Sequence, residues 1–145
     1  MTKFLYNDGG RAETKSGKKA GDCVARAIAI ASGFPYGEIH DRLTAGNYFQ
    51  RGGRTQGKGA DFGVITQRKW FKDLMREWGF TWTPTMKIGS GCQTHLRADE
   101  LPRGRLVCSV SRHYVAVIDG VINDTHDCSR GGTRCVYGYW MFCGA

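Results

Sequence analysis

Cys23 stands at the start of an apolar run, directly after Asp22. Aspartate is a favoured N-cap residue because its carboxylate can accept hydrogen bonds from the N–H groups of the first helical turn. The alanine- and isoleucine-rich residues that follow predict a buried helix, which Gly33 and Pro35 end. A cysteine in the first turn lies at the positive end of the helix dipole, which stabilises a thiolate. We therefore expect Cys23 to be a nucleophile.

His113 and Asp124 flank a predicted β-hairpin. The Asp-Gly dipeptide at 119–120, between two apolar runs, is a strong signal for a two-residue turn. With that turn, the alternation of side chains places His113 and Asp124 on one face, as diagonal neighbours about 7 Å apart. The same face is expected to carry Val115, Val117, Ile122 and His126. His126 would be the base instead if the turn had a different length.

These three residues together predict nucleophilic catalysis. A carboxylate beside an imidazole fixes its tautomer and stabilises its charged form. The imidazole can then form an ion pair with a cysteine thiolate. A single His–Asp pair is more often a polar strand end, but a cysteine at a capped helix start favours a Cys23–His113–Asp124 triad.

The elements that must position these residues change character along the chain. Besides the Cys23 helix, the first half predicts helices over 36–45 and 66–78, and a glycine-rich loop over 50–61 that borders the cleft. The predicted strands are 4–6, 106–110, 113–118, 121–125 and 136–142. We expect one α+β domain over residues 1–145, with N-terminal helices packed on a C-terminal antiparallel sheet.

The six cysteines could form a disulfide framework, bind zinc or remain free. The N-terminus lacks an apolar stretch of signal-peptide length, and no run approaches a membrane span, so we expect a cytoplasmic protein with free thiols. A zinc site would draw on His126, Cys128, Cys135 and Cys143. This set lacks a Cys-x-x-Cys pair, and we therefore predict neither a metal nor a cofactor.

The formal net charge of the chain is +8. Such a charge suits nucleic acid, an acidic partner or simple solubility. The basic residues are not interleaved with aromatic residues as in known nucleic-acid modules. We favour a protein or peptide substrate, and a basic nucleic-acid-associated protein is an alternative.

The residues around Cys23 and His113 resemble the papain-like cysteine hydrolase superfamily. The order Cys23, His113, Asp124 matches its nucleophile at a helix start, its histidine opening a strand and its carboxylate or amide on the next strand. Compact double-glycine peptidases and NlpC-type cell-wall peptidases are the most similar members, and both begin this helix with Asp-Cys. The segments 22–32 and 106–127 also look typical of bacteriophage proteins, which would place the chain in a host cytoplasm. The resemblance implies a cysteine peptidase or amide hydrolase.

One departure concerns the oxyanion site. Papain-like enzymes usually place a glutamine shortly before the cysteine, whereas this chain has Ser16, Lys18 and Lys19 there. The backbone N–H of Cys23 would then be one donor, and one of these three side chains the other. The same departure suits an inactive papain-like fold that serves as a binding or virion structural protein.

Overall fold

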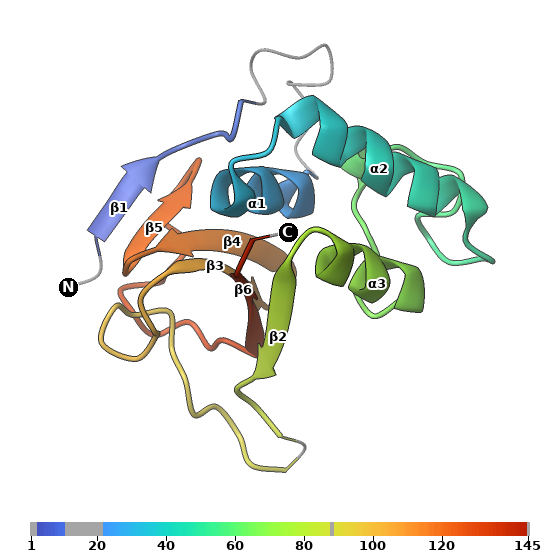
Figure 1. Ribbon diagram of the computed structural model, residues 1–145. Coiled ribbons are helices and arrows are strands. Elements are labelled where there is room, and N and C mark those ends of the chain that lie inside the picture. The colour runs from blue at the N-terminus through green and yellow to red at the C-terminus, as the bar shows by residue number, and fades with distance from the viewer. Residues whose placement is uncertain (1–2, 11–21, 88, 145) are drawn as a thin grey trace.

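A computed structural model describes residues 3–10, 22–87 and 89–144 (Figure 1). In chain order its elements are β1 (Lys3–Tyr6), α1 (Cys23–Ser32), α2 (Tyr36–Phe49), the 3-10 turn η2 (Ala60–Phe62), α3 (Lys69–Glu77), β2 (Phe80–Pro84), β3 (Arg105–Val110), β4 (His113–Ile118), β5 (Val121–Asp124) and β6 (Gly138–Phe142). The chain therefore has the predicted α+β composition. The helix predicted over 36–45 continues to Phe49, and the one predicted over 66–78 is shorter, at Lys69–Glu77.

The six strands form one mixed sheet in the order β1-β5-β4-β3-β6-β2. Every neighbouring pair is antiparallel except β1 and β5, which run parallel. The antiparallel pairing expected of the C-terminal strands is therefore confirmed, and the N-terminal strand β1 adds a parallel pair at one edge of the sheet. A parallel pair needs a long crossover connection, and here the chain passes through all other elements except β6 between its two strands.

Helices cover one face of the sheet and loops cover the other. Figure 1 shows α1 lying across β4 and β5, with α2 outside it and α3 beside β2. One buried cluster joins the helices to the β4 residues Tyr114 and Ala116. The second cluster holds Val115 and Val117 together with residues of the loops, such as Leu96. The alternation expected for β4 is thus confirmed.

The hairpin that joins β4 to β5 has the predicted turn. Asp119 and Gly120 have φ angles of 48° and 81°, the left-handed conformation that this type of two-residue turn requires. Ile118 pairs with Val121, as the turn length predicts. This register brings the start of β4 beside the end of β5.

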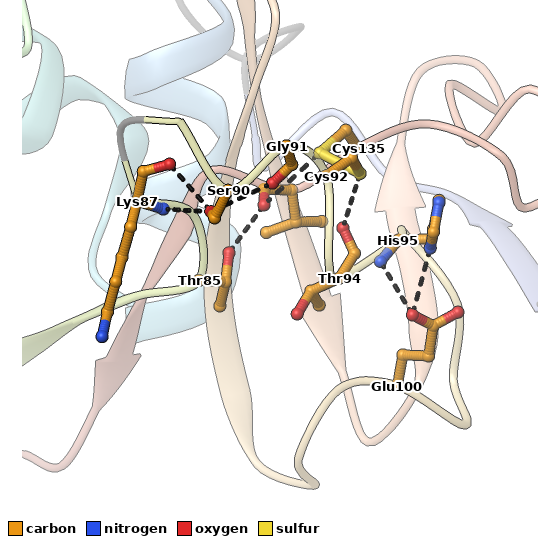
Figure 2. The surroundings of a disulfide bond; sticks show 10 residues. Thr85, Lys87, Ser90, Gly91, Cys92, Thr94, His95, Glu100 and Cys135 are labelled. Carbon is orange, nitrogen blue, oxygen red and sulfur yellow. Dashed lines mark hydrogen bonds and ion pairs between the residues drawn. A yellow bond between two sulfur atoms is a disulfide. The ribbon is translucent and has the colours of Figure 1, made fainter.

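A disulfide bond joins Cys92 to Cys135 (Figure 2). The prediction of free thiols is wrong for this pair, which closes a loop across 43 residues of sequence. Thr85 adds a hydrogen bond from its hydroxyl to the carbonyl of Val136, at 2.6 Å. The loop after β2 is therefore fastened to the segment that leads into β6.

Among the described residues, no helix combines the length and the apolar character that crossing a membrane requires.

Candidate active site

Three elements meet at the predicted triad. Cys23 is the first residue of α1, His113 the first of β4 and Asp124 the last of β5. α1 is anchored by eight consecutive buried residues, 24–31, and ends at Gly33 with a left-handed φ of 78°. Burial along this whole helix fixes where its N-terminus lies on the sheet, and hence where the Cys23 thiol lies.

His113 and Asp124 are hydrogen-bonded, with 2.6 Å between Nε2 of the ring and Oδ2 of the carboxylate. Burial disfavours the charged imidazole, but the bond to Asp124 and the thiols of Cys128 and Cys23 raise the pKa of His113 to about 11. Asp124 is itself buried, which favours its neutral form. The hydrogen bond and charge of His113 nevertheless lower the pKa of Asp124 to about 2. The pair is therefore an imidazolium beside a carboxylate.

The Cys23 thiol lies against the same imidazole. Burial raises its pKa, but three influences outweigh it: the hydrogen bond and charge of His113, the backbone N–H of Tyr114 and the charge of Arg26. The net result is a pKa below the usual value of 9.0. Cys108, by contrast, is fully buried in the second cluster, and burial raises its pKa. The environment of Cys23 thus favours a thiolate paired with an imidazolium.

A buried arginine that sequence reasoning missed connects the helix to the triad. One Nη of Arg26 contacts Asp22 and the other lies 3.2 Å from Oδ1 of Asp124. All three side chains are at least 93% buried. The sequence did indicate the ion pair with Asp22, because Arg26 is the sole charged residue in an apolar helix and stands four positions after Asp22.

Asp22 does not cap the helix in the predicted way. Among the described residues, its carboxylate makes no hydrogen bond to an N–H group of the first turn. It contacts Arg26 instead, and accepts a hydrogen bond of 2.7 Å from the hydroxyl of Tyr36 in α2. A buried cation nearby is a stronger partner for a carboxylate than a backbone N–H. Asp22 therefore ties α1 to α2 rather than capping α1.

Two further side chains near His113 are those of His126 and Cys128. The ring of His126 lies 5.5 Å from the ring of His113, which agrees with the predicted shared face, but Asp124 bonds to His113. Asp124 therefore pairs with His113 rather than with His126. Cys128, buried in the loop after β5, is the group that sequence reasoning placed only in a zinc set.

The residues weighed for a zinc site, His126, Cys128, Cys135 and Cys143, do not form a metal-binding group among the described residues. Cys135 is bonded to Cys92, and Cys143 is an exposed free cysteine near the C-terminus. A different group, His113, Asp124 and Cys128, offers ligand atoms within 4.8 Å of one another. A cation bound there would replace the hydrogen bond between His113 and Asp124, since zinc ligands lie about 2.0–2.3 Å from the metal.

A cleft of about 580 Å³ runs past Cys23 and His113. Its lining includes Arg54 and Phe62, so the glycine-rich loop and the segment after it border the cleft, as predicted. The lining also includes a glutamine, Gln67, which lies just before α3. The predicted oxyanion donors Ser16, Lys18 and Lys19 lie outside the described residues.

The cleft continues into two neighbouring pockets. Toward β2 it shares five lining residues, including Tyr114 and Tyr137, with a pocket of about 300 Å³ that Trp82 and Trp140 also line. On the other side it shares Arg112 and His113 with a pocket of about 450 Å³. The cleft and the two pockets therefore form one groove that extends beyond Cys23 and His113 on both sides.

Comparison of the chain with protein-family models, with curated proteins and with solved structures found no match in any of the three. The interpretation of the site therefore rests on its own residues and geometry.

Proposed function

We propose that the protein is a cysteine hydrolase of amide bonds, acting on a peptide or protein through Cys23, His113 and Asp124. The observation that carries this proposal is the contact of one imidazole with both a thiol and a carboxylate. Its hydrogen bond to Asp124 is 2.6 Å long, and its contact with Cys23 lowers the pKa of that thiol. A nucleophile, a base and an orienting group in contact are the arrangement that nucleophilic catalysis requires.

The reaction proceeds in two halves. The Cys23 thiolate adds to the carbonyl carbon, the C–N bond breaks, and the proton of the His113 imidazolium passes to the departing amine. His113 then removes a proton from water, whose oxygen adds to the thioester carbon. The C–S bond breaks, the acid product leaves and the thiolate is restored. Asp124 holds the ring orientation throughout and stabilises the imidazolium in the resting state.

The oxyanion that forms in each half needs hydrogen-bond donors. The N–H groups of the first helical turn have no partner within the helix, and that of Cys23 is adjacent to the nucleophile. Gln67 supplies an amide side chain in the same cleft, from a different part of the chain than the family pattern uses. We assign the backbone N–H of Cys23 and the Gln67 amide as donors.

The extent of the groove supports a polypeptide substrate. The cleft and its two flanking pockets hold residues on both sides of the Cys23–His113 pair. An extended chain can lie in such a groove, whereas a small amide would occupy only its centre.

Alkylation with iodoacetamide at pH 6 tests the proposal. Cys23 should react faster than the exposed Cys143, because an ordinary thiol is mostly protonated at that pH. The His113→Ala variant should lose at least about tenfold of this rate. A Cys23 rate that His113→Ala leaves unchanged would contradict the ion pair. In a companion assay, a mixed peptide pool followed by mass spectrometry should show cleavage that Cys23→Ala abolishes.

A further inference from the structure

The pocket beside His113 is strongly basic. It has a volume of about 450 Å³ and is lined by Ser111, Arg112, His113, His126, Arg130 and Arg134. Three arginines and two histidines thus line the pocket, with no carboxylate group in its described lining. Such a concentration of positive charge attracts anions, and arginine binds carboxylates through two parallel hydrogen bonds.

The charges of these arginines are not neutralised within the described residues. Arg112 and Arg130 are exposed and have no ion pair there. The guanidinium of Arg134 donates to the backbone carbonyls of Ser111 and Cys128, which carry no net charge. Its Nε is buried without a hydrogen-bond partner. Within the described residues, no carboxylate therefore offsets the positive charge of these arginines.

Two of these arginines occupy strained backbone positions. Arg112 and Arg130 have φ angles of 56° and 54°, and Asp119 is the other described non-glycine residue with a positive φ. A side chain in this region costs roughly 1 kcal/mol, a cost that glycine would avoid. Strain of this kind is often found at functional sites. It also means that glycine can replace either arginine without harming the fold.

We propose that this pocket binds the carboxylate of an acidic residue on the leaving-group side of the scissile amide. His113 lines both the pocket and the cleft, whereas Cys23 lines only the cleft. Since His113 gives its proton to the departing amine, the part of the substrate that follows the scissile bond lies toward this pocket. The inference rests on the proposed function and names its substrate class, a polypeptide with Asp or Glu just after the cleaved bond.

The anion preference is measured without knowledge of the substrate. Iodoacetate and iodoacetamide both alkylate Cys23 with loss of iodide, but only iodoacetate is negatively charged. The rate of alkylation by iodoacetate divided by the rate of alkylation by iodoacetamide therefore reports the local positive potential. In the Arg112→Gly/Arg130→Gly variant we expect this ratio to fall by about tenfold. Because the neutral reagent is the denominator, the ratio is insensitive to a change in thiol reactivity.

The matched control removes two positive charges elsewhere. Arg103 lies next to the 119–120 turn, at the opposite end of β4 from His113, and Lys87 is exposed in the loop of Figure 2. The Arg103→Gln/Lys87→Gln variant should keep the wild-type ratio. If the ratio fell equally in both variants, or if it fell in neither variant, the assignment of the pocket would be overturned.

Paired peptides test the position of the acidic residue. One pool carries Asp and Glu after the cleaved bond, and the other carries Asn and Gln at the same places. The wild-type protein should cleave the acidic pool at least about tenfold faster, and the arginine double variant should lose that preference. Cleavage with the acidic residue preferred before the bond instead would overturn the proposed orientation.

Failure of this inference is distinguishable from failure of the proposed function. A Cys23 that reacts slowly with iodoacetamide contradicts the function itself. A reactive Cys23 with no arginine-dependent preference contradicts only the acidic substrate. Protection of Cys23 from iodoacetate by a single-stranded oligonucleotide, with none by an oligoglutamate peptide, would assign the pocket to nucleic acid and overturn the polypeptide assignment.

Discussion

Asp124 is held from three directions, and these contacts fix the orientation of its carboxylate. One of its oxygens bonds to His113, while the other accepts hydrogen bonds from Arg26 at 3.2 Å and from the backbone N–H of Thr125 at 2.7 Å. A carboxylate with both oxygens engaged cannot rotate without breaking charged hydrogen bonds. The imidazole orientation is therefore set by Arg26 as well as by Asp124, which makes Arg26 a positioning residue.

Replacing Arg26 should destabilise the fold strongly. Arg26→Met removes the buried cation that contacts both Asp22 and Asp124. We expect a loss of about 3–5 kcal/mol in the free energy of unfolding, measured by urea denaturation. The control is Arg42→Met, whose ion pair with Glu77 is more than half exposed and should be worth about 1 kcal/mol or less. Equal losses in the two variants would show that the buried network adds nothing.

The sequence was informative about the triad because each member has a local signal. Cys23 follows an aspartate, a residue type favoured at helix starts, and a two-residue turn sets the spacing of His113 and Asp124. The contact of Arg26 with Asp124 could not be predicted, because the two residues lie 98 positions apart and nothing local indicates it. Asp22 was misinterpreted for the same reason: its actual partners include Tyr36 of a different helix.

At the scale of elements, close packing between α2 and α3 depends on Gly46. A Cβ atom at this position would lie 2.2 Å from Cζ3 of Trp70. Trp70 belongs to α3 and is fixed by a hydrogen bond of 3.0 Å from its Nε1 to Gln50. α3 also carries Lys72 and Arg76, which line the pocket beyond the cleft. The glycine therefore supports one wall of the groove.

Alanine substitutions at two glycines of α2 should have opposite effects. Gly46→Ala forces α2 and α3 apart and should cost about 1–3 kcal/mol. Gly37→Ala has open space around its Cβ and should add about 0.5–1 kcal/mol, because alanine loses less backbone entropy in a helix. Thermal unfolding of both variants checks this. Destabilisation of similar size at the two positions would contradict the packing described here.

The two edge strands, β2 and β1, show what local sequence patterns could not predict. β2 was missed because its pattern is not alternating: after the buried Phe80, its four following residues are all exposed. Its last residue, Pro84, is also typical of an edge rather than of a central strand. β1 was predicted, but its parallel pairing with β5 is a contact between distant segments that no local pattern encodes.

At the scale of the whole molecule, the chain brings distant segments together at one end of the sheet. The N-terminus of α1, the start of β4 and the end of β5 meet there, with basic and aromatic pockets on either side. The α+β class was predictable because helical and strand patterns occupy different halves of the sequence. The disulfide was not, because Cys92 is one of six cysteines and the pairing depends on the folded path of the chain.

We infer that these segments bring together a thiolate–imidazolium pair. The pKa of Cys23 lies below 9.0 and that of His113 above 6.5. Lowering the thiol pKa and raising the imidazole pKa both widen the pH range in which the pair is ionised. The pair should therefore be ionised over a wider pH range than an isolated cysteine and histidine would allow.

The ultraviolet absorbance of the thiolate, measured against pH as the difference between wild type and Cys23→Ala, tests this most directly. We predict that the Cys23 signal appears below pH 9 in the wild type. In His113→Ala it should move to higher pH, since burial then acts on the thiol without the opposing hydrogen bond and charge of the imidazolium. A Cys23 that ionises at pH 9 or above in the wild type, or at the same pH in both proteins, would contradict the account.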